Sequence, residues 1–213
     1  MLIKILDWGT WIVPILLTGA CISLYIFRTT NKSYQKILFY FLLLSLFFDL
    51  ASRYWSYVFK QNLNFISIFA ILEVLIFYIF YNTLKQRHKR IRLFLATAVL
   101  IYLGVDIFFM QSKNISTFQT YSRSLSACFI VLSSMLYYIQ IIKQHKVAFE
   151  LIQLNSVILL YYALNVILYL PINYILNVSL DVNLTLWIFK LILLLLFYTF
   201  LWTHLWTYGK RKR

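Results

Sequence analysis

Apolar residues occur in seven long runs that are separated by short polar connections. The runs cover residues 10–27, 35–59, 65–84, 92–111, 117–142, 152–174 and 184–207. A helix that crosses the hydrocarbon core of a bilayer, about 30 Å thick, needs about 20 mostly apolar residues. The pattern therefore predicts an all-α polytopic membrane protein, with residues 1–213 forming a single transmembrane domain built as a seven-helix bundle. No connection is long enough to fold as a soluble catalytic or DNA-binding domain.

Composition agrees with this pattern. The 213 residues are 62% hydrophobic and 12% charged, with a mean hydropathy of +0.79. Soluble domains are about 45–50% apolar and about 25% charged. Only four glycines and two prolines occur, which excludes collagen-like and linker-rich chains. The first run lacks a basic segment followed by a small-residue cleavage site, so we expect it to be a retained helix and not a signal peptide.

Basic residues fall mainly in alternate connections, and this predicts the orientation. The chain has 20 Lys and Arg against six Asp and Glu, a net charge of +14. On the opposite side stand only Lys4, Lys60 and Lys113. Because cytoplasmic connections carry the excess of Lys and Arg, we expect an outside N-terminus and a cytoplasmic C-terminus in a bacterial inner (plasma) membrane. The residues of the richer side are Arg28, Lys32, Lys36, Lys85, Arg87, Lys89, Arg90, Arg92, Lys143, Lys146, Lys210, Arg211, Lys212 and Arg213.

Two tracts of this basic side predict contact with lipid or with a partner. One tract contains Lys85, Arg87, Lys89, Arg90 and Arg92, and the other is Lys210–Arg213. Attraction to anionic headgroups is worth about 1 kcal/mol for each basic residue near the surface. We expect lipid headgroups as partners there, and we do not expect nucleic acid. A protein partner or a second copy of the chain stays open.

Six charged residues lie inside the apolar runs, and they are the candidate ligand-binding residues. A charge near the bilayer centre costs about 2.5–3.5 kcal/mol on insertion scales, so each needs a reason. Counting at 1.5 Å per residue from the outer helix ends places all of them in the outer half, within about 15 Å of the surface. Their charges sum to zero, as a paired interior network requires. They are Asp49, Glu73, Asp106, Arg53, Arg123 and Lys190.

Helical spacing gathers polar residues on single faces of several runs. Asp49 and Arg53 form an i,i+4 pair, on the same face as Ser45, Ser52 and Ser56. Small residues in the first run predict close helix packing around Thr18, Gly19, Ala20 and Ser23. We interpret the Asn and Ser residues as contacts between helices, and Glu73 and Lys190 as the functional pair, because neither has a partner on its own helix. Two further polar stripes are Gln119, Arg123, Ser126, Ser133, Tyr137 and Gln140, and Asn155, Tyr162, Asn165, Tyr169 and Asn173.

Other chemistries fit the sequence less well. The three histidines lie on the cytoplasmic side while the membrane carboxylates lie in the outer half, so we expect no metal site and no cofactor. Lys190 invites a retinal Schiff base, but the third run lacks the Arg-Tyr…Asp pattern of microbial rhodopsins. A membrane-embedded lipid hydrolase would use Asp49 and Glu73 as general acid and base. Arg53 should hold Asp49 ionised, and no Ser–His pair is evident in the outer half.

Two resemblances bear on function. Sliding the chain by 117 residues places Glu73 on Lys190 and Phe80-Tyr81 on Phe197-Tyr198. This resembles the 3+1+3 repeat of the small SWEET and PQ-loop transporters, and it implies that polar residues of the third and seventh helices face the substrate. Those families carry hinge prolines in both repeats and often a Pro-Gln pair, whereas this chain has Pro14, Pro171 and no Pro-Gln.

The second resemblance is to small uncharacterised bacterial seven-helix proteins. They combine an acidic–Arg pair in the second helix with a lone Glu in an aromatic third helix, as in Asp49…Arg53 and Phe69-Ala70-Ile71-Leu72-Glu73. This resemblance implies no activity. Proteins of similar composition also serve as membrane accessories of bacterial defence systems, including RNA-targeting CRISPR loci.

Together these patterns predict a non-enzymatic membrane protein that binds a small polar or zwitterionic ligand in an outward-facing charge cluster, for transport or sensing. Glu73 would meet a cationic group of the ligand and Lys190 an anionic group, with the Asp49–Arg53 pair orienting them. The alternatives are an accessory that acts through the basic cytoplasmic face and, third, the lipid hydrolase.

Overall fold

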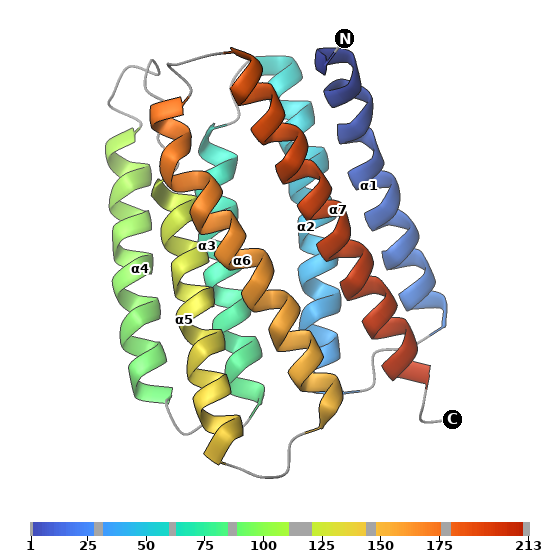
Figure 1. Cartoon of the computed structure of the whole chain (residues 1–213), viewed down its shortest axis with the longest axis vertical. Coiled ribbons are helices and arrows are strands. Elements are labelled where there is room, and N and C mark those ends of the chain that lie inside the picture. Colours follow the sequence, from blue (N-terminus) through green and yellow to red (C-terminus); the bar gives the residue numbers. More distant parts are fainter. Residues whose placement is uncertain are drawn as a thin grey trace. The chain divides into compact units, whose positions relative to one another are not determined.

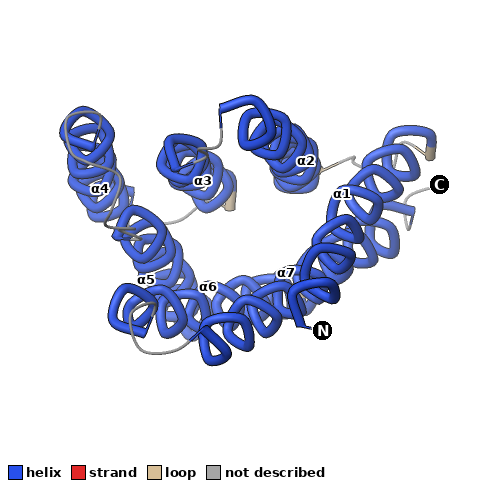
Figure 2. The backbone as a smooth tube through the Cα atoms, turned by 90° about the horizontal axis from the view of Figure 1, so that it is seen from above, coloured by secondary structure: helices blue, strands red, loops and turns tan. Residues whose placement is uncertain are grey.

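The computed structural model describes residues 2–27, 32–59, 63–84, 89–110, 121–143, 148–175 and 180–210, and these ranges form seven helices (Figure 1). Within these ranges there is no strand (Figure 2). The all-α prediction is therefore confirmed for the described part of the chain. The helices are α1 (Leu2–Ile26), α2 (Ser33–Phe59), α3 (Leu63–Thr83), α4 (Lys89–Met110), α5 (Tyr121–Lys143), α6 (Phe149–Ile175) and α7 (Leu180–Lys210).

Six of these helices are long and apolar enough to cross a membrane. Their apolar windows are Gly9–Ile26, Ser33–Phe59, Lys89–Phe108, Tyr121–Lys143, Phe149–Leu170 and Leu184–Gly209. The remaining helix, α3, is 21 residues long, and its apolar stretch within the residues whose side chains are described is Ser67–Thr83.

The outer faces of the helices are apolar as well. Phe47 of α2, Phe94 and Ile101 of α4, and Leu196 of α7 are between 62% and 72% exposed. Soluble monomers rarely expose continuous apolar patches larger than a few hundred Å². This apolar surface is compatible with a membrane protein.

The helices extend beyond the apolar runs at several ends. Helix α1 begins at Leu2 although the run begins at residue 10, because Lys4 and Asp7 interrupt the apolar pattern without preventing a helix. Helix α2 begins earlier than expected because the Gln35 side chain caps it: the backbone N–H of Lys32 donates to Gln35 Oε1 at 3.0 Å. Such a bond satisfies one of the donors at the start of the helix.

The contacts divide the chain into two compact units, Met1–Tyr54 with Ile175–Arg213, and Trp55–Tyr174. In the first unit, α1 packs along α7 (Figure 1). The Trp202 indole N–H donates to Ser23 Oγ at 2.8 Å and joins these two helices. Helix α2 packs on α7 through an edge-to-face contact between Phe41 and Phe197, with ring centroids 6.3 Å apart.

In the second unit, α3 packs against α4 and α5. Phe77 is fully buried and contacts the ring of Tyr162 on α6 edge-to-face. A buried polar network joins three helices at Asn155 of α6. Its Oδ1 accepts from Tyr81 of α3 and from Ser134 of α5, both at 2.9 Å. Asn and Ser therefore act as contacts between helices here, as expected from the sequence.

The polar stripes predicted on α5 and α6 face the interior. Ser126, Ser133, Tyr137 and Gln140 of α5 are all buried. So are Asn155, Tyr162, Asn165 and Tyr169 of α6. Gln119 lies outside the described residues, and the side chain of Asn173 is not described. The inward orientation of both stripes is confirmed for the described members.

Candidate functional site

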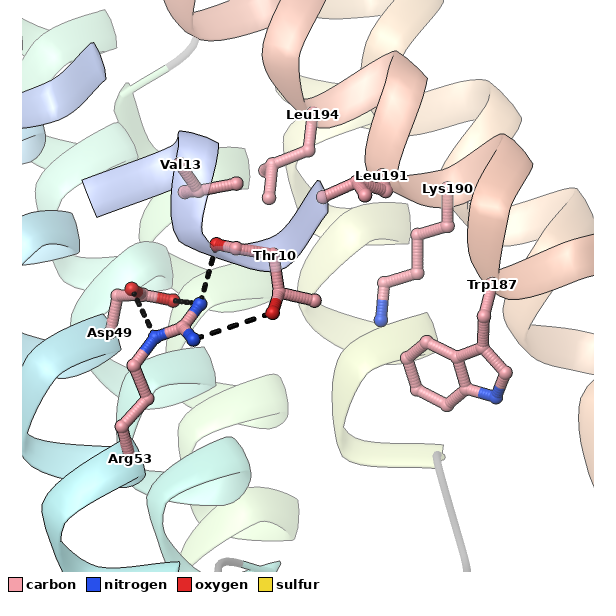
Figure 3. Close-up of a pocket in the computed structure, with 8 residues that line it drawn as sticks. All are labelled: Thr10, Val13, Asp49, Arg53, Trp187, Lys190, Leu191 and Leu194. Carbon is pink, nitrogen blue, oxygen red and sulfur yellow. Dashed lines mark hydrogen bonds and ion pairs between the residues drawn. The ribbon is translucent and has the colours of Figure 1, made fainter. Parts of the chain in front are cut away.

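Arg53 joins two helices of the first unit through an ion pair and hydrogen bonds. Arg53 Nε lies 2.8 Å from Asp49 Oδ2, so the predicted i,i+4 ion pair on α2 is confirmed. The same guanidinium reaches α1, where Nη2 donates to the backbone carbonyl of Thr10 at 2.7 Å and Nη1 to its hydroxyl at 3.4 Å. It also lies over the ring of Trp11, 5.0 Å from the centroid. Arg53 thus connects α2 to α1 (Figure 3).

The carbonyl of Thr10 is available for this bond because of Pro14. In an α-helix the carbonyl of residue 10 accepts from the N–H of residue 14, and proline has no N–H. Pro14 lies inside α1, so it leaves the Thr10 oxygen without its donor within the helix. An unsatisfied carbonyl at membrane depth costs several kcal/mol, and Arg53 supplies the missing donor from the neighbouring helix.

Lys190 of α7 lines the same cavity as Asp49 and Arg53. Its ammonium lies over the ring of Trp187, 4.2 Å from the centroid, in a cation–π contact. Together with Thr10, Asp49 and Arg53 it lines a cavity of about 160 Å³ (Figure 3). Val13, Leu191 and Leu194 complete the lining. The cavity therefore joins a polar wall with two cations and one carboxylate to an apolar wall.

Close approach of α1 and α7 shapes this cavity. A Cβ atom placed on Gly9 would lie 2.8 Å from Leu191 Cδ2, so only glycine fits beside the leucine as it stands. Gly19, which we expected to allow close packing, has no atom within 4 Å of such a Cβ. That expectation is wrong for Gly19, because it lies where α1 leaves open space, whereas Ala20 beside it is fully buried.

Glu73 belongs to the second unit, where it is held by neighbouring helices. It is 4% exposed. The Tyr162 hydroxyl of α6 donates to Oε1 at 2.7 Å, and Arg123 Nη1 of α5 lies 3.2 Å from Oε2. Ser126 also reaches Oε2, at 3.4 Å. Glu73 is thus the meeting point of α3, α5 and α6, and it is a satisfied interior carboxylate.

Arg123 and Asp106 are the other two candidate residues in the second unit. The Arg123 guanidinium lies over the Phe69 ring, 4.6 Å from the centroid. Asp106 of α4 accepts a short hydrogen bond from the Ser122 hydroxyl of α5. Ser67 of α3 donates to the same hydroxyl at 3.4 Å. These contacts join α3, α4 and α5, and they engage both partly buried charges.

The six candidate residues therefore form three local arrangements. Asp49, Arg53 and Lys190 share the cavity of the first unit, Glu73 pairs with Arg123 in the second, and Asp106 bonds Ser122. Sequence reasoning missed Thr10 and Trp187. The signal for Thr10 was Pro14 four residues later, and the signal for Trp187 was its place one turn before Lys190.

The basic tracts are described only in part. Lys89 and Arg90 are exposed at the start of α4, as a lipid-facing or partner-facing tract requires. Arg92, in the same turn, is fully buried and does not join that exposed surface. Lys85, Arg87, Arg211, Lys212 and Arg213 lie outside the described residues, and of Lys210 only the backbone is described.

Among the described residues, no three His, Cys, Asp or Glu side chains gather as metal ligands. Comparison with protein-family models, with curated proteins and with solved structures finds no match. The functional argument therefore rests on the residues of the cavity and on the contacts around them.

Proposed function

We propose that the chain is an integral membrane protein that binds a small ligand carrying an anionic group in the cavity beside Lys190. The observation that carries this proposal is the composition of the cavity wall: Arg53, Lys190 and one carboxylate, Asp49. Arg53 is already engaged by Asp49 and by Thr10. With two cations and one carboxylate, the wall carries a net positive charge, and Lys190 contributes one of the two positive charges.

The size of the cavity limits the ligand. A cavity of about 150 Å³ holds a molecule such as benzene, and this one measures about 160 Å³. Drug-sized ligands occupy about 300–1,000 Å³. The ligand would be a carboxylate or a similar small anion, with its charged group near Lys190 and an apolar body against Leu191 and Leu194.

The orientation predicted from the basic residues supports an outward-facing site. With the N-terminus outside and all seven helices spanning, α3 included, Thr10 and Lys190 lie in the outer half of the membrane. Ligand binding there serves uptake or sensing of a small anion from outside the cell. Glu73 has no part in this version of the site, because three interhelical donors already engage it.

A matched set of probes tests the proposal. Benzoate, benzamide and benzylamine have the same ring and carry a negative, a neutral and a positive group. With purified protein in nanodiscs, we expect calorimetry to give benzoate at least tenfold tighter binding than benzamide or benzylamine. Lys190→Met should abolish this preference, because the net positive charge of the wall is lost.

Lys143→Met is the control, because Lys143 is an exposed lysine at the end of α5 and its removal should leave the preference intact. No binding of any probe, or an equal preference in Lys190→Met, would refute the proposal. Uptake of radiolabelled benzoate into proteoliposomes then separates transport from sensing.

The accessory role stays the second candidate, because exposed Lys89 and Arg90 begin α4. In cells, neutralising both residues should abolish an accessory function and leave benzoate binding unchanged. Lys190→Met should have the reverse effects. The two candidates therefore differ in which charges they need.

A further inference from the structure

Arg92 is a buried cation with no ion pair to any residue in the described part of the chain. It is 0% exposed, on the first turn of α4. None of its three guanidinium nitrogens has a hydrogen-bond partner among the residues that the structure describes. Its electrostatic neighbours are Tyr78 and Tyr81 of α3, which are uncharged. A buried guanidinium is strongly unfavourable unless an anion or acceptor oxygens satisfy it.

The N-terminal turn of α4 also favours a negatively charged group. The first N–H groups of a helix have no partner within it, and the helix dipole places partial positive charge there. Helices therefore favour acidic residues in the first turn, but α4 has none there and begins Lys89-Arg90-Ile91-Arg92. Because helical side chains tilt toward the N-terminus of their helix, we expect Arg92 to lean toward that end of α4.

We infer that Arg92 and the first turn of α4 bind a phosphate group, from a lipid headgroup or as free phosphate. A guanidinium offers five N–H donors in a fork that matches phosphate oxygens, and free helix N–H groups bind phosphate in the same way.

The depth of the site agrees with a headgroup. The apolar window of α4 begins at Lys89, and three further residues of helix place Arg92 about 4.5 Å along the axis. That position lies at the edge of the hydrocarbon core, next to the headgroup region. The site differs from general attraction of surface lysines to lipid, because the cation that would hold the phosphate is enclosed by protein.

Thermal unfolding of lipid-stripped protein in dodecyl maltoside tests this inference. The probes are inorganic phosphate, dihexanoyl phosphatidic acid, and dihexanoylglycerol as the phosphate-free control. A ligand about a hundredfold above its Kd stabilises the folded state, so we expect a phosphate probe to raise Tm by several degrees. Dihexanoylglycerol should leave Tm unchanged. A rise with phosphatidic acid alone assigns the site to a headgroup, and a rise with inorganic phosphate assigns it to free phosphate.

Two variants decide whether Arg92 carries the effect. Arg92→Met should lose the shift, while Arg90→Met, an exposed arginine of the same turn, should keep it. If Arg92→Met does not fold, Arg92→Lys retains the charge without the fork and should show a clearly reduced shift. Absence of a shift with both phosphate probes would overturn the inference. An unchanged shift in the Arg92 variant that folds would overturn it as well.

Discussion

The bond between Arg53 and the Thr10 carbonyl makes a quantitative prediction about Pro14. In the wild type, Arg53 provides the donor that Pro14 cannot give. Replacing Pro14 by Ala restores an N–H four residues after Thr10, so the carbonyl regains a helical partner. The carbonyl then no longer depends on Arg53. Removing Arg53 should therefore destabilise the Pro14→Ala protein less than the protein with proline.

The magnitude follows from the groups involved. Leaving a buried acceptor without a partner costs about 1–3 kcal/mol. Removing Arg53 also leaves the partly buried Asp49 carboxylate without its ion-pair partner, which would obscure the effect. The comparison is therefore made in an Asp49→Asn background, where no carboxylate is left unpaired. In that background we expect Arg53→Met and Pro14→Ala to couple by about 1–3 kcal/mol.

Reversible unfolding in mixed micelles gives the free energies. The four proteins of the cycle carry Asp49→Asn alone, with Arg53→Met, with Pro14→Ala, and with both changes. Their unfolding is followed by circular dichroism as the fraction of denaturing detergent rises. Arg90→Met replaces Arg53→Met in a control cycle, which should be additive because Arg90 is exposed on α4. A coupling energy of zero in the Arg53 cycle would falsify the account of Pro14.

Two further predictions concern single contacts. Tyr162→Phe removes the hydroxyl donor to Glu73 and should destabilise the fold by about 1–2 kcal/mol. The control Tyr57→Phe changes an 87% exposed side chain and should alter the free energy of unfolding little. Equal effects of the two variants in unfolding experiments would contradict the assigned bond. Gly9→Ala should cost up to about 1 kcal/mol, because only the end of a flexible leucine must move. Gly19→Ala should be neutral or stabilising by about 0.5–1 kcal/mol, since Ala suits a helix better than Gly and its methyl group has open space there. A larger loss of stability in Gly19→Ala than in Gly9→Ala would show that the assigned packing is wrong.

Local patterns predicted much of the fold. Apolar runs indicated all seven helices, and helical spacing indicated the Asp49–Arg53 pair and the buried faces of α5 and α6. These features depend on residues within one helix, so the period of the helix is enough to find them. Helix ends were less well predicted, because Lys4 and Asp7 belong to a helix without belonging to an apolar run.

Contacts between helices could not be predicted in the same way. Glu73 looked unpartnered because its partners lie on α5 and α6, and no periodicity within α3 reveals which helices are its neighbours. The close-packing glycine was assigned to Gly19 from neighbouring small residues, whereas the actual contact at Gly9 depends on where Leu191 of α7 lies. Arg92 was grouped with exposed basic residues because they are adjacent in sequence, although its side chain is buried.

The partners of Glu73 have a consequence for the synthesis of the protein. Arg123 follows it by 50 residues and Tyr162 by 89 residues. At about 5–20 residues per second, the ribosome needs roughly 3–18 s to make them. During that interval, in the membrane-spanning bundle that we propose, α3 carries a carboxylate whose insertion is unfavourable and whose partners do not yet exist. In that bundle we therefore expect α3 to complete its insertion only after α5 has been made, when Arg123 can pair with Glu73.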